Sequence, residues 1–258
     1  MKVFDHYARY YDLLYRDKDY ESETEYIHAL IQNLVPGART VLNLGCGSGR
    51  HDRLLAKHGY TVTGVDLSAE MLSLATASAI DDGALEYIRG DVRTITLGRQ
   101  FDVVVSLFHV MSYQTANEDL LAAFTTAYKH VKPAGGFIFD CWYGPGVLTD
   151  RPAVRVKKLE DADLDVTRIA SPMMHPQNNL VDVDYLIFIR NKINGRANEI
   201  RETHHMRYLF EPELRLMLKA AGFDTLHFAE WMTNAELDFN SWNAVVTAKA
   251  SSIQEQRT

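Results

Sequence analysis

The sequence predicts an α/β protein with a doubly wound, mostly parallel seven-stranded sheet and an antiparallel β insertion after the fifth strand. Two observations predict the core. Short apolar runs of strand length alternate with segments of helical periodicity between about residues 36 and 150. The first of these runs, residues 41–44, ends in three glycines at alternate positions. A third observation predicts the insertion, because residues 151–207 alternate between polar and apolar like half-buried antiparallel strands.

The N-terminal residues 1–35 are predicted to form a helical cover. Aromatic and apolar residues recur there at helical spacing. In the first helix they are Tyr7, Tyr10, Tyr11, Leu14 and Tyr15, and in the second they are Ile27, Leu30, Ile31 and Leu34. The aromatic stripe of the first helix has two interpretations: it packs against the core, or one or two of its rings lie over a cationic ligand.

The remaining elements follow in order. Parallel strands are predicted at residues 41–44, 61–65, 88–92, 101–105 and 137–141, with helices between them. Pro133 is expected to end the helix before the fifth strand. Inside the insertion, Asn194 and Gly195 predict a hairpin turn. A last helix ends at Gly222, and strands at 225–230 and 242–249 close the sheet. The core therefore comprises residues 1–150 and 208–250, the insertion 151–207, and a polar tail 251–258.

Composition excludes several classes of partner. The chain has 258 residues and a net charge of −7 without a Lys/Arg run, which argues against a nucleic-acid partner. No apolar run has the length of a membrane span and the N-terminus is polar, so we expect a cytoplasmic protein without a membrane partner. Cys46 and Cys141 are expected to be reduced. No metal-ligand spacing occurs, and adjacent His204 and His205 would face opposite sides of a strand.

The glycine turn predicts a nucleotide site. Gly45, Gly47 and Gly49 let the backbone adopt positive φ and let a ligand lie against the main chain. The turn leads into a helix N-terminus at the carboxyl edge of the sheet. Its spacing is neither the dinucleotide pattern G-x-G-x-x-G nor a phosphate loop. Asp66 ends the second strand, where a carboxylate can accept both hydroxyls of a ribose, and Asp91 ends the third.

This series of features resembles the class I S-adenosylmethionine (SAM) methyltransferases over about residues 36–141. The resemblance implies that the glycine turn wraps the amino-acid end of SAM, that Asp66 holds the ribose, and that Asp91 pairs with the adenine amino group. It also implies that Leu67 and Met71 flank the adenine. The residues that we assign to the cofactor are Tyr20, Gly45, Cys46, Gly47, Asp66, Leu67, Met71, Asp91, Val92, Leu107 and Phe108.

The N-terminal tyrosines narrow the resemblance. Residues 11–15 and 18–20 are similar to the signature of enzymes that dimethylate the amino group of nucleotide-linked deoxysugars. In that subfamily the tyrosine at the position of Tyr15 lines the sugar pocket and the one at Tyr20 touches SAM. Tyr113 stands where those enzymes carry a His or Tyr that faces the acceptor amine. His109 lies in the same loop and is the second choice for this role.

Acceptor-side residues complete the assignment. We predict Tyr113, His109 and Tyr15 as catalytic residues. Trp142 and Tyr143 follow the fifth strand, where they could stack on a sugar or a base, or simply form a packed lid. The substrate-binding set is Tyr15, Trp142, Tyr143 and Arg207. Further side chains of the insertion that could meet substrate phosphates are Arg168, His175, Arg201 and His205.

The function predicted from the sequence is SAM-dependent methylation of a small molecule, in first place the amino group of a nucleotide-linked deoxysugar such as a dTDP-sugar. An O- or N-methyltransferase of another small metabolite is the nearest alternative, because residues 240–243 lack the glycine-rich stretch of the aminosugar enzymes. A non-catalytic SAM-binding protein is a further alternative, and the glycine spacing disfavours an NAD-dependent oxidoreductase. The sequence leaves open whether the protein is a monomer or a homodimer.

Overall fold

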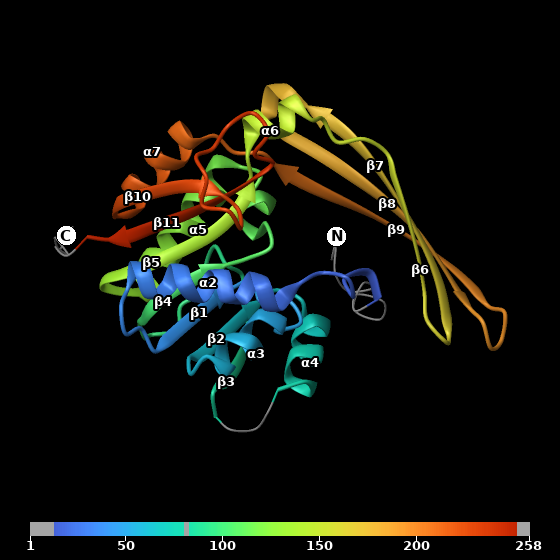
Figure 1. The fold of residues 1–258 in the computed structure, drawn as a ribbon, viewed down its shortest axis with the longest axis horizontal. Coiled ribbons are helices and arrows are strands. Elements are labelled where there is room, and N and C mark those ends of the chain that lie inside the picture. Colours follow the sequence, from blue (N-terminus) through green and yellow to red (C-terminus); the bar gives the residue numbers. More distant parts are fainter. Residues whose placement is uncertain (1–12, 80–82, 252–258) are drawn as a thin grey trace.

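The computed structural model describes residues 13–79 and 83–251. Within these residues it confirms the predicted fold class, with a seven-stranded core sheet and a separate four-stranded sheet after β5 (Figure 1). The strand order of the core sheet is β10-β11-β5-β4-β1-β2-β3, and β11 runs antiparallel to both of its neighbours. The core strands are β1 Thr40–Leu44, β2 Thr61–Asp66, β3 Leu85–Arg89, β4 Phe101–Ser106, β5 Val131–Trp142, β10 Phe223–Glu230 and β11 Asn243–Ala250.

Helices cover both faces of the core sheet. On one face Ile27 and Leu55 of the helices pack against strand residues such as Val41. On the other face Phe124 and Leu218 pack against strand residues such as Leu42. Burial on both faces explains why β1 reads as an apolar run instead of an alternating pattern. The helices are α2 Tyr20–Leu34, α3 Arg50–Lys57, α4 Ala69–Ala77, the 3₁₀ helix η1 Val110–Tyr113, α5 Asn117–His130, α6 Gly144–Thr149 and α7 Glu211–Ala221.

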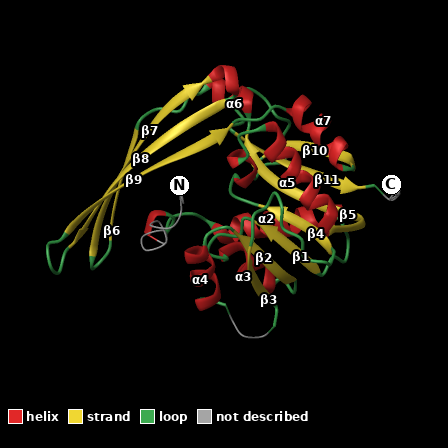
Figure 2. Ribbon diagram, turned by 180° about the vertical axis from the view of Figure 1, so that it is seen from behind, coloured by secondary structure: helices red, strands yellow, loops and turns green. Residues whose placement is uncertain are grey.

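The insertion is an antiparallel meander of β6 Arg155–Glu160, β7 Leu164–His175, β8 Leu180–Asn191 and β9 Ala197–Arg207, with the 3₁₀ helix η2 Pro176–Asn178 between β7 and β8. Figures 1 and 2 show it leaving the core beside α6 as a long curved blade. The predicted hairpin turn at Gly195 joins β8 to β9, with φ of 69° at that glycine. The inner face of the blade carries Val166 and Ile187, which are buried against Leu14 of the N-terminal segment and Met71 of α4.

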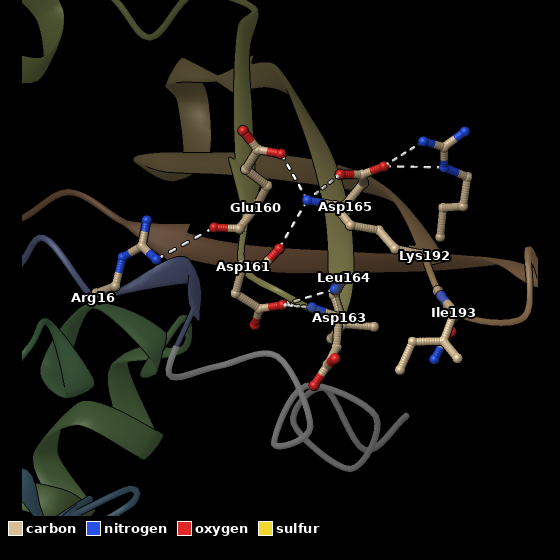
Figure 3. A network of polar contacts seen from close by, with 10 residues as sticks. Arg16, Glu160, Asp161, Asp163, Leu164, Asp165, Lys192 and Ile193 are labelled. Carbon is tan, nitrogen blue, oxygen red and sulfur yellow. Dashed lines mark hydrogen bonds and ion pairs between the residues drawn. The ribbon is translucent and has the colours of Figure 1, made fainter.

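Polar contacts fasten the blade to the N-terminal segment. Lys157 Nζ donates to the carbonyl of Leu14 at 2.9 Å, and Arg16 donates to the carbonyl of Glu160 at 3.3 Å. Figure 3 shows the second contact beside a network at the tip of the blade. In this network Lys192 joins the carboxylates of Glu160 and Asp165 at 2.7 and 3.2 Å, so the two hairpin turns are tied together.

Several predicted boundaries were wrong. Strand β3 ends at Arg89, so Asp91 lies in the following turn, where Thr94 and Ile95 donate to its carbonyl. Strand β5 begins at Val131, before Pro133, because the chain passes directly from α5 into pairing with Phe101 of β4. Tyr7, Tyr10 and Tyr11 lie outside the described residues. Among the residues that are described, no helix combines the length and apolar character needed to cross a bilayer.

Candidate active site

The glycine turn lies at the carboxyl end of β1. Gly45 has φ of 85° and packs so closely that a Cβ there would approach Val110 to 2.5 Å. The N–H groups of Gly45 and Cys46 both donate to the carbonyl of Val65, which fixes the turn to β2. Gly47 has φ of 54°, and a Cβ built on it would meet no heavy atom of the described residues within 4 Å. The turn is thus packed on its Gly45 side and open at Gly47, as a ligand lying against the backbone requires.

Asp66 ends β2 beside this turn. Its Oδ2 accepts the N–H of Gly47 at 2.8 Å and its Oδ1 accepts the N–H of Ser68 at 2.9 Å. Burial raises the pKa of Asp66, and the hydrogen bonds from the backbone oppose that rise. Each carboxylate oxygen can accept a further hydrogen bond. A pair of vicinal hydroxyls is therefore a suitable partner, and in this respect the residues present fit the ribose of SAM.

The turn after β3 places Asp91 in a different environment from the one expected. Arg93 donates to both oxygens of Asp91, at 2.9 and 2.6 Å, and also reaches Asp119 at 2.9 Å. Its hydrogen bonds are the main reason why the pKa of Asp91 is lowered. Because Oδ1 also accepts the backbone N–H of Arg93, only Oδ2 keeps free acceptor capacity. One such position is sufficient for an amino-group contact.

The apolar cofactor candidates divide into exposed and packed residues. Leu67 is 62% exposed, so its side chain can cover an apolar ring. Met71 is 2% exposed and belongs to the cluster with Leu14, while Leu107 is 3% exposed and packs in the core. Val92 is partly buried and packs against the core cluster that contains Phe124. Leu67 is the one of this group whose side chain the protein leaves uncovered, within the described part of the chain.

Tyr20 is held near the glycine turn by a network that the sequence analysis missed. Glu23 of α2 bonds the ammonium of Lys18 and lies 2.9 Å from Nε2 of His51 in the first turn of α3. The Tyr20 ring packs edge-on against His51, with 5.0 Å between centroids, and the guanidinium of Arg50 lies 5.0 Å from the same ring. Because α3 begins directly after Gly49, this network joins the N-terminal segment to the glycine turn.

The loop after β4 is held by a buried carboxylate. Phe108 and His109 both have left-handed backbones, with φ of 67° and 63°, which is strained for residues with a Cβ. Asp140 at the end of β5 is 1% exposed; it accepts the N–H of His109, and its Oδ2 lies 2.7 Å from Nδ1 of that residue. Burial disfavours the charged carboxylate, but the charge and hydrogen bonds of His109 outweigh burial and lower the pKa of Asp140.

The sequence carried a signal for Asp140 that the sequence analysis did not use. Like Asp66, it is an acid that directly follows a run of apolar strand residues. On the acceptor side of this loop, the ring of Tyr15 meets that of Phe108 edge-on at 5.2 Å, and the ring of Trp142 lies 6.4 Å from that of His109. The structure therefore brings Tyr15, His109 and Trp142 into one neighbourhood around Phe108.

Tyr113 joins this neighbourhood from η1. Its hydroxyl is 2.7 Å from Nδ1 of His204, which β9 of the insertion supplies. Burial raises the pKa of the Tyr113 phenol well above its usual value, so the group stays neutral. Tyr113 and Trp142 pack against the same buried cluster, whereas Tyr143 packs against the core cluster that contains Leu214. Trp142 and Tyr143 therefore pack on different sides, Trp142 beside Tyr113 and Tyr143 against the core.

The basic residues of the insertion have different partners and different exposure. Arg207 is 5% exposed, and its guanidinium donates to Asn117 at 2.8 Å and to Glu213 at 3.0 Å. It therefore bridges the start of α5 and α7 and is not presented to a phosphate, contrary to its assignment from the sequence. His175 and His205 both bond Asp182, and Arg201 pairs with Glu199. Arg168 lies over the Tyr185 ring at 5.0 Å, on the inner face of the blade.

Comparison with known proteins identifies the family. Residues 41–135 match the model of a methyltransferase domain. A dTDP-3-amino-3,6-dideoxy-alpha-D-glucopyranose N,N-dimethyltransferase of Streptomyces fradiae is 32% identical over 182 residues, which are 70% of each chain. The chain belongs to the class I SAM-dependent methyltransferases.

Two further comparisons extend over more of this methyltransferase. A putative methyltransferase of Bacillus subtilis, YqeM, is 29% identical over 91% of this chain and 92% of its own. The crystal structure of Streptomyces venezuelae DesVI has the same fold, with a TM-score of 0.80 and 24% identity over 95% of this chain and 98% of its own. The cofactor of the methyltransferase is SAM, and its acceptor is a small molecule.

Proposed function

We propose that this methyltransferase acts on the amino group of a nucleotide-linked deoxysugar, such as a dTDP-sugar. The observation that carries the proposal is the neighbourhood of Tyr15, His109 and Tyr113, which unites hydrogen-bonding rings from the N-terminal segment and the loop after β4. These rings can hold an amine by hydrogen bonds. A carboxylate in direct contact with the amine would instead favour the protonated form, which is unreactive. The relative from Streptomyces fradiae, whose name states this chemistry on a dTDP-aminosugar, supports the same substrate class.

The proposed cofactor roles are those assigned from the sequence, and the contacts around the glycine turn support them. The turn at Gly45–Cys46–Gly47 and the ring of Tyr20 lie where they can enclose the amino-acid end of SAM, and Asp66 lies where it can receive the ribose. The proposed adenine contacts are Leu67 and Oδ2 of Asp91. When bound, SAM supplies a methyl group on a sulfonium, and transfer to the amine's lone pair leaves the C–S electron pair on a neutral thioether.

The task of the protein is alignment. An amine must present its lone pair along the methyl–sulfur axis, and orientation of this kind can account for much of the rate. We propose that Tyr15 and Tyr113 hold the amine by hydrogen bonds. His109 is fixed by Asp140 at Nδ1, so its Nε2 is the nitrogen left to contact the acceptor.

The test is a panel of dTDP-aminosugars and their hydroxyl counterparts, incubated with SAM and analysed by mass spectrometry. A product heavier by about 14 or 28 Da, for one or two methyl groups, is expected only with the aminosugars. Methylation of the hydroxyl counterparts, or of neither group, would contradict the proposal. The absence of a glycine-rich stretch at residues 240–243 makes another small metabolite the second candidate, so the panel should include unrelated amines.

A further inference from the structure

The inner face of the blade carries a chain of buried polar groups that the cofactor and acceptor assignments do not use. Nδ1 of His204 lies 2.7 Å from the hydroxyl of Tyr113, and Nε2 of the same ring lies 3.4 Å from Oε2 of Glu202. The side chains of His204 and Glu202 are each 6% exposed. The other carboxylate oxygen of Glu202, Oε1, is buried and has no hydrogen-bond partner among the described residues.

Charge determines which nitrogen of His204 carries the proton. A carboxylate accepts hydrogen bonds only, so Nε2 must bear a hydrogen where it faces Glu202. Nδ1 of a neutral ring then accepts the hydrogen bond of the Tyr113 hydroxyl. This arrangement is that of a histidine base oriented by a carboxylate.

We propose that Tyr113, His204 and Glu202 form a relay that removes the proton from the methylated amine, and that the insertion thereby contributes to catalysis. The proposal rests on the proposed function, because an amine that gains a methyl group carries one proton too many. That proton passes to Oη of Tyr113 while the Tyr113 hydroxyl proton moves to Nδ1 of His204. The resulting imidazolium is stabilised by Glu202 until it releases a proton to solvent.

Other ionisable groups face the relay. Tyr15 from the N-terminal segment and Tyr185 from β8 lie near Tyr113, and the ring of Tyr185 packs edge-on against His204 at 4.8 Å. Arg168 from β7 stands over Tyr185. Burial raises the pKa of the Tyr185 phenol, so this group keeps its proton, and Nδ1 of His204 is the nitrogen that faces the Tyr113 hydroxyl.

The test compares the buried His204 with an exposed histidine outside the site. In His204→Asn the amide oxygen can keep the hydrogen bond with Tyr113 but cannot accept a proton. We expect kcat to fall roughly 100-fold or more and the imidazole-dependent inflection in its pH profile to disappear, with SAM affinity unchanged by calorimetry. The control His227→Asn changes an exposed histidine of β10, at the edge of the core sheet, and its kcat and pH profile should match the wild type.

A second readout needs no acceptor. Nitrogen NMR of selectively labelled histidine should find that neutral His204 carries its proton at Nε2. A proton at Nδ1 of the neutral ring would overturn the relay whatever the acceptor. An unchanged pH profile of kcat in His204→Asn, with an aminosugar that the wild type methylates, would overturn it and leave the proposed function intact. Failure of every amine in the panel would instead contradict the proposed function, and the NMR result would then decide on the relay.

Discussion

Individual acids in this methyltransferase differ in what surrounds them, although the sequence presents them alike. Asp66 receives backbone N–H groups, Asp91 an arginine, and Asp140 a histidine. Asp52, in the first half of α3, is fully buried and accepts a hydrogen bond from Asn43 at 2.6 Å, while its Oδ2 finds no partner among the described residues. The chemistry open to each acid therefore depends on its partners.

Asp66→Ala should abolish SAM binding. The carboxylate both positions Gly47 and offers two acceptors for the ribose, and charge-assisted hydrogen bonds of this kind are worth about 1.5–3 kcal/mol each. We expect the affinity measured by calorimetry to fall roughly 100-fold or more. The control is Glu70→Ala, an exposed residue of α4. Unchanged SAM affinity in Asp66→Ala would show that the cofactor site is wrongly placed.

Asp52→Asn should change how stability depends on pH. Burial raises the pKa of Asp52 to about 7, compared with about 3.9 for an unfolded chain. The stability that protonated Asp52 contributes is complete below about pH 4 and is lost as the pH rises towards 7. Urea unfolding at pH 5, 6 and 7 should therefore show that the free energy of unfolding of the variant rises relative to that of the wild type by about 1 kcal/mol per pH unit. A constant difference would show that Asp52 is ionised throughout.

At the scale of elements, the loop between β4 and η1 depends on β5. Two consecutive left-handed residues, Phe108 and His109, cost free energy that the pairing with Asp140 must offset. Asp140→Asn leaves His109 without its carboxylate, so we expect a loss of about 3 kcal/mol in the free energy of unfolding at pH 7.

The pH dependence of that loss has a defined sign. Because the pKa of Asp140 is lowered in the folded protein, its contribution is present above about pH 4 and disappears as the pH falls through the folded-state value. The difference between Asp140→Asn and wild type should shrink in acid. Asp224→Asn, at an exposed position of β10, serves as the control. An equal loss at pH 3 and pH 7 would mean that the carboxylate charge has no part in holding the loop.

Periodicity was sufficient to predict the strands and most helices, because burial on both faces leaves continuous apolar runs. It failed where tertiary pairing decided the structure. Val131 pairs with Phe101 although Pro133 follows, and a Cβ at Gly135 would lie 2.6 Å from the carbonyl of Asp102. The absence of a side chain at Gly135 allows β5 to approach β4. In the sequence, the same glycine after Pro133 resembled the end of a helix.

The site shows the same division. Gly45, Gly47 and Asp66 come together as predicted, because neighbouring parallel strands end at the same edge of the sheet. The contact between Tyr113 and His204 spans 91 residues and depends on where the blade docks, so no local pattern could indicate it. The burial of Arg207 is equally a tertiary effect, since its partners belong to α5 and α7.

At the scale of the whole molecule, residues 13–19 lie between the core and the blade (Figures 1 and 2). Ile187 on the inner face of β8 is fully buried in the cluster that includes Leu14, while Phe188 next to it is 41% exposed on the outer face. The blade therefore stabilises the segment that carries Tyr15 and Tyr20.

Ile187→Ala should loosen this arrangement. Removal of a fully buried isoleucine costs about 2–5 kcal/mol, and the loss falls on the cluster that holds the segment. We expect trypsin to cleave after Arg16 and Lys18 several-fold faster than in the wild type, as measured by mass spectrometry under native conditions. Phe188→Ala should leave the cleavage rate near that of the wild type. Equal rates in both variants would show that the blade does not protect the segment.

The opposite orientations of His204 and His205 limit how the length of the blade can vary. Loss of one residue within β9 ahead of Glu202 would turn Thr203 and His205 inward in place of Glu202 and His204. Shortening or lengthening the turn at residues 192–196 leaves the pairing of β8 with β9 unaltered. Natural or engineered length variants therefore keep the carboxylate of Glu202 beside the histidine opposite Tyr113 only when the change is confined to that turn.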